Sequence, residues 1–536
     1  MVTPWTRRLD PVELTLCACT GLDLRNYLKP LTCVQLPTLA PVLRDIESTM
    51  RNARSLLLAL PLLAMSVACA PEESDTESEA PSADEAALLD RGVSRGRAVR
   101  TFPVQAGRPD EVCVLPKRMP GADYKKDDTK DEEELCSFKL SGAAPREEGA
   151  AAKDVAVCPK LSSTNPGTDV HELLPGKTRA ETEAAICKLE DRPTKHLAKF
   201  KQSITCSYTP SILGYYHLSR ALGGVGDVRP AVLRTYDLEQ HKGVVANALR
   251  ILAGQPNDSY PKISWLSFQR AEANPAAARA KDALFTTDLL QIYGAMQDNP
   301  RGEVKYSEIN RRGASPNIHS QFVRTPAYAR IIDARPVKDT VGRTLAQAAQ
   351  PIVQMRDISE MLLMDFLMSQ QDRFGNIHAV DMIYFPKEGG GFDTVKKAKV
   401  DDGEIPMPAG GVVVRKMLLK DNDCGGPSKD NIVRKNGLLA QIRHMNPKTY
   451  KHLRWLAQNF APQTPVPKFM VSEAAFSQAD INMLRENLGL AANTLTDACR
   501  TGKLRLDLDL KAHLAGTAQE AGACDAAEPA AELPTP

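Results

Sequence analysis

The stretch Asp357–His378 (DISEMLLMDFLMSQQDRFGNIH) constrains the fold of this chain more than any other segment. Its first half is rich in Leu and Met, and Asp357 followed by Glu360 is typical of a helix N-terminus. Apolar side chains surround the predicted helix on nearly every side, so we expect it to lie buried in the middle of a domain. A polar loop follows directly, and loops carried by rigid buried elements commonly hold reactive side chains.

A second segment downstream supplies complementary groups. Val412–Leu419 (VVVRKMLL) predicts a buried strand, which runs into the turn Lys420–Gly426 (KDNDCGG). Phosphoryl transfer requires one carboxylate that orients the acceptor hydroxyl and another that holds the metal ion on the phosphates. Asp372 in the loop after the helix and Asp421 after the strand are our candidates for these two roles.

Four segments of the chain are similar, in the same order, to segments of one kinase family. MLLMDFLMSQQDR resembles the catalytic helix and loop of the secretory-pathway kinases, the family of the Golgi casein kinase and the glycosaminoglycan xylosylkinase. YYHLSRALGG with RPAVLR resembles the helix and loop upstream, LLKDNDCGG the metal-binding strand and turn, and GLLAQIRHMNPKTYKHLRWL the helical segment that follows. The similarity covers roughly residues 195–457, about half the chain.

The resemblance implies an α+β, two-lobed atypical protein-kinase-like fold whose C-terminal lobe is mostly helical. It implies Asp372 as the catalytic residue and Asp421 as a metal ligand, with ATP and Mn²⁺ or Mg²⁺ as cofactors. Asp423, two residues further on, is a second candidate ligand. Asn376 is a second catalytic candidate, although it follows the aspartate by four residues, where family members that carry an Asn have it five residues after.

The same resemblance gives a division into domains. Residues 91–235 form the N-terminal lobe region, residues 236–514 the C-terminal kinase-like lobe with insertions, and residues 515–536 a flexible tail. Residues 276–296 are Ala-rich and predict a helix. The segment that joins the two candidate aspartates is longer than the family leads us to expect.

The segment Lys195–Ile204 (KHLAKFKQSI) alternates as a strand does. Lys199 and Lys201 lie on one face of it, and a nucleotide-binding lobe needs a strand lysine that reaches the phosphates. Either lysine fits this cofactor-binding role. The helix that follows lacks the family's Glu, because Ser211–Leu213 occupy that region, so the acidic partner of the lysine stays unidentified.

The front of the chain carries an export signal. Met50 opens a signal peptide at residues 50–69, with a positive start, a short apolar core and small residues before Cys69. This pattern resembles the bacterial lipoprotein signal, in which Cys69 becomes the lipidated N-terminus. Residues 1–49 are then a mis-translated leader, and residues 70–90 a disordered acidic tether. We therefore expect a protein anchored to a membrane by its lipid, at the outer membrane or periplasmic face of the cell envelope.

Eight cysteines follow Cys69, and an even number beyond a signal peptide is typical of disulfides in an oxidising compartment. Proximity in the sequence suggests two pairs, Cys113 with Cys136 and Cys158 with Cys187. Cys524 is placed to tether the tail to Cys499 or to another cysteine.

These features predict a lipid-anchored extracytoplasmic kinase that transfers the γ-phosphoryl group of a nucleotide to a protein or glycan hydroxyl. The net charge is only +2, so nucleic acid is not expected as a partner. One alternative is a catalytically inactive kinase-fold lipoprotein that acts as a surface binding or scaffold module, which the scarcity of ATP outside the bacterial cytoplasm favours. Another is transfer of a nucleotidyl group on the same fold.

Overall fold

The computed structural model describes residues 96–141, 152–163, 165–281, 284–298, 300, 302–309, 318–517 and 523–525. The expected leader, the signal peptide with Cys69, the acidic tether and most of the expected tail lie outside these residues. Within them, no helix combines the length and the apolar character that a membrane crossing requires.

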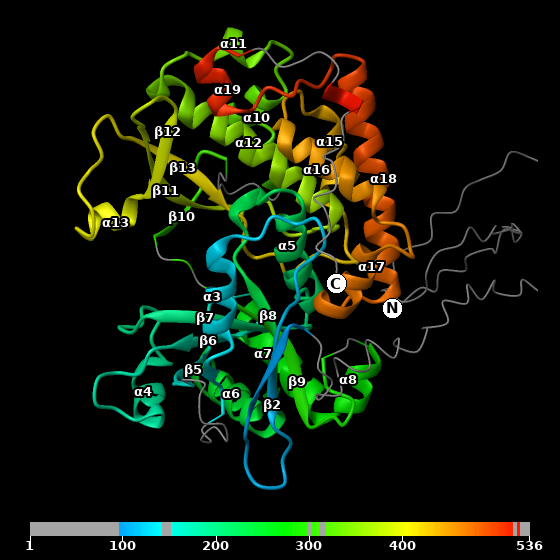
Figure 1. Cartoon of the computed structure of the whole chain (residues 1–536). Helices are drawn as coiled ribbons and strands as arrows, with labels where there is room; N and C mark the ends of the chain where they lie inside the picture. The colour runs from blue at the N-terminus through cyan, green and yellow to red at the C-terminus, as the bar shows by residue number, and fades with distance from the viewer. Residues whose placement is uncertain are drawn as a thin grey trace, which may run out of the picture. The chain divides into compact units, whose positions relative to one another are not determined.

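Seven strands form the larger sheet, in the order β1-β2-β8-β9-β7-β6-β5, and every neighbouring pair is antiparallel (Figure 1). The strands are β1 (Ala98–Phe102), β2 (Glu111–Leu115), β5 (Ala156–Pro159), β6 (Thr168–His171), β7 (His196–Gln202), β8 (Ala231–Asp237) and β9 (Gln291–Asp298). The strand predicted at residues 195–204 is confirmed as β7.

Helices cover one face of this sheet. Trp265 and Phe268 of α7 share a hydrophobic core with Phe200 of β7 and Val232 of β8. Alternate residues of β7 therefore face this core, and the residues between them, Lys199 and Lys201 among these, face the other way. The helices that occur between the strands of this sheet in the sequence include α3 (Lys126–Leu135), α4 (Arg179–Ile186), α6 (Leu238–Ile251), α7 (Tyr260–Ala273) and α8 (Pro275–Lys281).

The expected boundary between residues 235 and 236 falls inside β8 (Ala231–Asp237). The sheet continues to β9, so the helix predicted over residues 276–296 is wrong beyond α8. Ala-rich sequence favours helix locally, but Ile292 and Met296 pack fully buried in the sheet core, and this packing decides the structure.

The apolar stretch lies in α12 (Leu345–Leu367), which is buried over most of its length and packs against α10, α14, α15, α18, α19 and β13. The helix begins earlier than predicted, since Thr344 caps it by accepting a hydrogen bond from the Gln347 N–H. Asp357 is therefore not the cap but a buried side chain inside the helix, and its carboxylate accepts the Met417 N–H at 2.7 Å.

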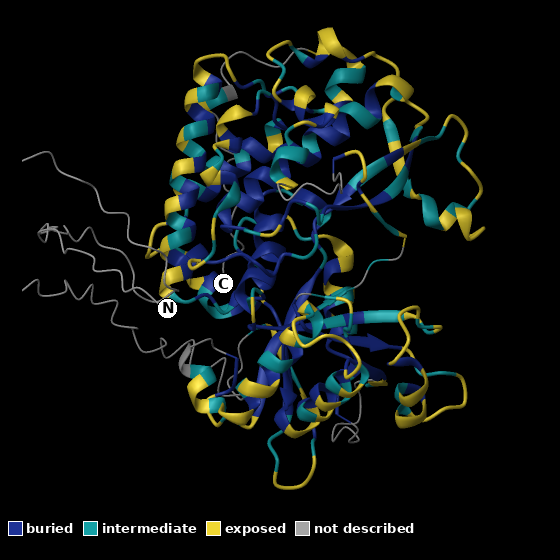
Figure 2. Cartoon of the chain, turned by 180° about the vertical axis from the view of Figure 1, so that it is seen from behind, coloured by how far each residue is buried: buried dark blue, intermediate teal, exposed yellow. Residues whose placement is uncertain are grey.

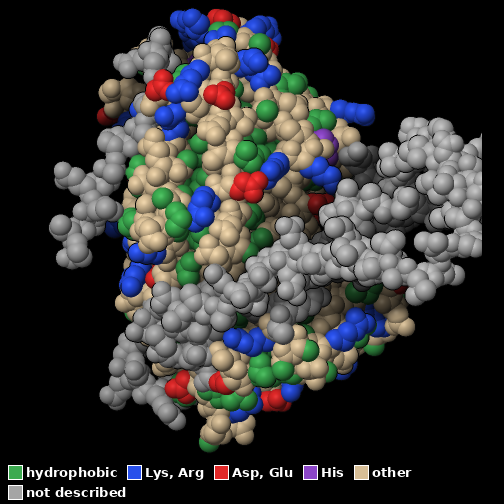
Figure 3. Space-filling view, turned by 90° about the vertical axis from the view of Figure 1, so that its right-hand side faces the viewer, with side chains coloured by type: hydrophobic (Ala, Val, Ile, Leu, Met, Phe, Trp, Pro, Cys, Tyr) green, Lys and Arg blue, Asp and Glu red, His purple; other side chains and the backbone are tan. Residues whose placement is uncertain are grey.

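Most of the other helices in the described residues lie around α12, whereas α13 lies beside strands β11 and β12 (Figures 1 and 2). These other helices are α5 (Thr209–Ala221), α9 (Ile318–Phe322), α10 (Pro326–Ile331), α11 (Val337–Thr340), α13 (Lys397–Asp401), α14 (Ile432–Lys435), α15 (Leu438–Gln441), α16 (Pro447–Gln458), α17 (Pro465–Ala474), α18 (Gln478–Arg500) and α19 (Leu510–Ala515), with short 3₁₀ turns η1 (Val225–Asp227) and η2 (Ala523–Asp525). On the face in Figure 3, basic and acidic side chains are interspersed.

The long segment between Asp372 and Asp421 forms most of a second sheet. Its strands are β10 (Glu303–Lys305), β11 (His378–Pro386), β12 (Phe392–Lys396) and β13 (Val412–Leu418), and β11 pairs antiparallel with the other three. A short parallel pair, β3 (Phe138–Lys139) with β4 (Lys153–Asp154), stands apart. The predicted strand at residues 412–419 is confirmed as β13, although only part of it is buried.

Four disulfides lie within the described residues, and the fold is mixed α+β, as predicted. Cys113–Cys136 and Cys158–Cys187 confirm the two expected pairs, and Cys499–Cys524 confirms the tether near the C-terminus. Cys206–Cys424 joins positions 218 residues apart. Disulfides of this number indicate an oxidising, extracytoplasmic compartment.

The buried carboxyl of Asp357 gives a pH-dependent stability. Burial raises its pKa to about 7, against the opposing effects of the Met417 N–H and the Lys416 charge. Between the ordinary pKa and this value the folded chain keeps a proton that the unfolded chain has lost, so stability falls as pH rises from about 4 to about 7.

We expect Asp357→Asn, which keeps the acceptor for Met417, to flatten this part of the pH profile by on the order of 2 kcal/mol. Urea unfolding of both proteins at pH 5 and pH 7.5 measures the difference. Equal pH dependence in the two proteins would show that Asp357 is ionised throughout.

Candidate active site

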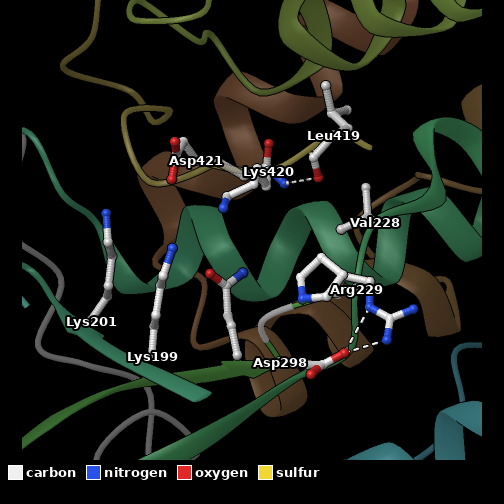
Figure 4. A pocket seen from close by; sticks show the side chains of 11 residues that line it. Lys199, Lys201, Val228, Arg229, Asp298, Leu419, Lys420 and Asp421 are labelled. Atoms are coloured by element: carbon white, nitrogen blue, oxygen red, sulfur yellow. Dashed lines mark hydrogen bonds and ion pairs between the residues drawn. The ribbon is translucent and has the colours of Figure 1, made fainter. Parts of the chain in front are cut away.

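A pocket lies where the larger sheet meets the end of β13. Figure 4 shows Lys199 and Lys201 projecting from β7 toward Lys420 and Asp421, with Arg229 and Asp298 at the far side. The lining residues are Lys199, Lys201, Val228, Arg229, Gln297, Asp298, Pro300, Leu419, Lys420, Asp421 and Asn422. The structure thus brings together both predicted cofactor-binding lysines and one predicted metal ligand.

Lys201 and Asp423 form a buried ion pair. The Lys201 ammonium donates to Asp423 Oδ2 at 2.6 Å, and the two side chains are only 5% and 4% exposed. Burial lowers the pKa of Lys201, but the charges of Asp423 and Asp421 raise it overall, so the ammonium stays charged. Asp423 thus pairs with Lys201, a contact that the sequence did not reveal, and this engagement disfavours its predicted role as a metal ligand.

Lys199 has a different environment from Lys201. It is half-buried and forms no ion pair within the described part of the chain. Burial and repulsion from Lys420 lower its pKa to about 8, against the attraction of Asp421 and Asp169. An ammonium held in this way is ready to accept an anionic partner.

Lys160 is a second such cation, and sequence reasoning missed it. It follows β5, and its N–H donates to the Gly167 carbonyl at 2.9 Å, which closes the loop between β5 and β6. Burial, with the charges of Lys201 and Lys199, lowers the pKa of Lys160 to about 8. Lys160 lies in a loop, where no sequence pattern indicates which way a side chain points. Its approach to Lys199 follows only from the pairing of β5 with β6 and of β6 with β7.

Asp421 is the carboxylate that remains available to a ligand. It has φ 54°, and its Oδ2 accepts the Asn376 amide at 2.8 Å. Burial raises its pKa, but neighbouring His378 and the charges of Lys160, Lys201 and Lys420 hold it well below the usual range. The predicted catalytic residue Asn376 thus contacts this carboxylate. His378, which the sequence did not indicate, also lies nearby, with its Nε2 at 3.5 Å from Asp421 Oδ2.

Asp372 lies exposed on the loop after α12 and forms no ion pair among the described residues. Its pKa is raised, because the surrounding protein removes part of its water and because the carboxylates of Asp423 and Asp421 repel its charge. The three predicted acidic residues therefore lie close enough to interact.

Arg373 fastens this loop to the turn after β13. Its guanidinium binds both oxygens of Asp365 on α12, at 2.9 and 3.0 Å. It also donates to the Lys420 carbonyl at 2.5 Å and to Asn422 Oδ1 at 2.6 Å. Because these partners flank Asp372 and Asp421, one buried side chain sets the position of both candidates.

The disulfide Cys206–Cys424 fastens the same turn from the other side. The Gln371 N–H donates to the Cys424 carbonyl at 3.1 Å, and the Tyr208 N–H donates to the Asp423 carbonyl at 2.7 Å. The turn is thus joined both to the loop with Asp372 and to the segment after β7.

A cavity of about 420 Å³ is lined in part by Gln371, the residue before Asp372. It is lined by His319, Gln371, Asp430, Ile432, Lys435 and Asn436. Asn431 beside it donates to the Phe366 carbonyl of α12 at 2.7 Å, so the cavity and the loop with Asp372 are held by the same helix end.

Asp169, His171 and His196 form another group that could hold a metal ion, with one ligand atom of each within 4.8 Å of the others. From the sequence we expected metal ligands only at positions 421 and 423. The strand pairing unites these three residues, because His171 and His196 are 25 positions apart in the sequence but opposite each other in the β6–β7 ladder.

Comparison with known proteins finds no family model that matches the chain and no curated protein that is significantly similar to it. The function of the chain therefore has to follow from the chemistry of these side chains.

The contacts of Arg373 predict its energetic role. Arg373→Met leaves the Asp365 charge buried without its cation, which costs about 3–5 kcal/mol of unfolding free energy. The matched control is Arg335→Met, since Arg335 pairs with Asp333 on the surface and its loss changes stability little. Urea unfolding measures both, and an equal effect of the two substitutions would contradict the role of Arg373.

Proposed function

We propose that this chain is an extracytoplasmic, metal-dependent kinase that transfers the γ-phosphoryl group of ATP to a protein or glycan hydroxyl, and that it is anchored to the cell envelope through lipidated Cys69. The observation that carries the proposal is the pair of ammonium groups, Lys160 and Lys199, beside the ionised Asp421. Neither ammonium has a carboxylate hydrogen-bond partner within the described residues.

Unpaired ammonium groups are costly to withdraw from water, so a bound polyanion stabilises this arrangement. A triphosphate supplies several negative charges in a row and suits a cleft with lysines on strand β7 and on the loops after β5 and β13. Lys199 is the better candidate for the phosphates, because Lys201 is already committed to Asp423.

The residues at Asp421 fit a hard divalent cation. An ionised carboxylate beside an amide offers oxygen ligands of the kind that Mg²⁺ and Mn²⁺ prefer. Such an ion neutralises phosphate charge when bound. The role of this chain is to hold Asp421 ionised, through His378 and the surrounding lysines, and to fix its position through Asn376 and Arg373.

Asp372 is suited to orient the acceptor hydroxyl. It is exposed, bears no ion pair in the described structure, and has a raised pKa that improves its capacity to accept a proton. The cavity lined in part by Gln371 has a mostly polar lining, as the approach of a hydroxyl-bearing protein or glycan requires. Both acceptor classes fit the proposal.

A second candidate function is a binding module with an inactive kinase-like site. The ion pair of Asp423 with Lys201 favours it, because this pair leaves Asp421 as the one carboxylate of the turn that is available to a metal. Transfer of a nucleotidyl group in the same cleft is a third candidate, since the same cations suit any nucleoside triphosphate.

Nucleotide binding tests the proposal directly. We expect ATP with Mn²⁺ or Mg²⁺ to raise the melting temperature, because a ligand that binds only the folded chain at 100 times its Kd adds about 2.7 kcal/mol of stability. Asp421→Ala abolishes the metal-dependent shift. A chain that melts cooperatively but shows no shift with any nucleotide would sink the catalytic proposal and favour the binding module.

The two lysines of β7 differ in their expected effects. Lys199→Met weakens ATP binding about tenfold or more, because a charged contact is lost, but leaves stability unchanged or higher. Lys201→Met leaves Asp423 buried and unpaired, which lowers the unfolding free energy by about 3–5 kcal/mol. Titration calorimetry and urea unfolding of both variants separate these effects, and the reverse pattern would assign the phosphates to Lys201.

A further inference from the structure

The group of Asp169, His171 and His196 shares the face of the larger sheet that bears Lys199. Asp169 lies opposite Lys199 in the β6–β7 ladder, and His171 follows Asp169 by two residues on β6. Residues two apart in a strand project from the same face. The group is thus beside the phosphate cleft but shares no ligand with Asp421.

A bulge brings His196 to this face. The register of β6 and β7 shifts between Val170 and His171, which leaves Leu197 outside the ladder. Without the extra residue, His196 would project to the opposite face from Lys199, three positions away. The imidazoles of His171 and His196 instead stack with 4.8 Å between their centroids and 12° between their planes.

The hydrogen bonds fix the lone pairs of His171. Arg192 Nη1 lies 3.0 Å from His171 Nε2 and 2.9 Å from Asp169 Oδ2. A guanidinium can only donate, so Nε2 accepts and the ring proton lies on Nδ1, which is 3.2 Å from Thr194 Oγ1. This is the arrangement of a metal-binding histidine, in which Nε2 ligates and an outer hydrogen bond holds Nδ1.

The positive charge of Arg192 therefore lies between two candidate ligand atoms, His171 Nε2 and Asp169 Oδ2. The second oxygen of the same carboxylate, Asp169 Oδ1, is buried and has no hydrogen-bond partner among the described residues, and His196 Nε2 lies 3.4 Å from it. A buried carboxylate oxygen without a donor is destabilising. A cation bound between Oδ1 and the two imidazoles removes that cost.

We propose that Asp169, His171 and His196 bind a transition-metal dication, with Zn²⁺ as the ion they fit best, in competition with Arg192. Two imidazoles and one carboxylate are a typical zinc ligand set, whereas Mg²⁺ and Ca²⁺ prefer oxygen ligands throughout. Binding displaces the guanidinium. His196 Nε2 gives up the hydrogen bond that it donates to the Ala198 carbonyl at 3.0 Å, its proton passes through solvent to Nδ1, and the freed lone pair ligates the metal. Three protein ligands leave a fourth position for water or another ligand.

This site does not depend on the proposed kinase function. Its ion lies on the same face of the sheet as Lys199 and adds positive charge there, but its ligands and its competitor, Arg192, come from β6, β7 and the segment before β7. Zinc binding can therefore be measured without any nucleotide.

The test is zinc binding by the full chain after treatment with a chelator. We expect one equivalent of Zn²⁺ by elemental analysis, and an intense visible absorption when Co²⁺ replaces it, as is usual for four-coordinate sites. His171→Ala and His196→Ala each lose this equivalent. His513→Ala is the matched control, because His513 on α19 contacts the Gly342 carbonyl, belongs to no such group within the described residues, and its loss leaves zinc binding intact.

Arg192→Ala gives the sharpest result. With the competing cation removed, the ligands are available in a larger fraction of molecules, so zinc binding tightens about tenfold or more. The proposal is overturned if neither the full chain nor Arg192→Ala binds more zinc than His171→Ala, or if binding is equal in all variants. Melting curves establish folding, and His171→Gln and His196→Gln replace any alanine variant that does not fold.

Discussion

The buried contact between Arg373 and Asp365 is the interaction on which the candidate site depends. Ion pairs of this kind add little net stability, because two charges lose their water, but breaking one is costly and its geometry is specific. The guanidinium reaches from the end of α12 to the Lys420 carbonyl and Asn422. Two segments that are far apart in the sequence are thereby held at one fixed separation.

Around this fixed point, the cleft gathers more positive charge than it pairs. Lys201 is neutralised by Asp423 and Lys420 by Glu303, at 2.6 and 2.5 Å. Lys160 and Lys199 remain, and their lowered pKa values reflect first their burial and then the repulsion of neighbouring lysines. These unpaired charges are unfavourable by themselves, and a bound anion would stabilise them, as expected of a binding site. The ion pairs elsewhere in the chain are already neutralised and offer no such site.

The sequence predicted those parts of the structure that depend on local patterns. The buried helix, the strands at 195–204 and 412–419, and three disulfides between cysteines near one another in sequence follow from periodicity and proximity. The start of α12 was missed, because Asp357 looks like a cap but uses its carboxylate for Met417 on a distant strand. The strand β9 was missed because an Ala-rich segment precedes it and its burial depends on the whole sheet.

In the candidate site too, the sequence predicted what local patterns determine and missed the contacts between distant segments. Asp372, Asp421 and the two lysines could be named from their segments, and the structure places them together. The pairing of Lys201 with Asp423, the arrival of Lys160 and the role of Arg373 could not, because each is a contact between segments with no shared pattern. The group of Asp169, His171 and His196 depends on a single extra residue in β7, which no spacing rule reveals.

The disulfide Cys206–Cys424 has a consequence for when the site can work. It closes the turn with Asp421 and Asp423 onto the segment after β7, and such a bond persists only in an oxidising compartment. In the reducing cytoplasm the newly made chain lacks this closure, so the turn is less firmly held against Lys201. Export would then serve as a maturation step that couples the closure of this turn to arrival in an oxidising compartment.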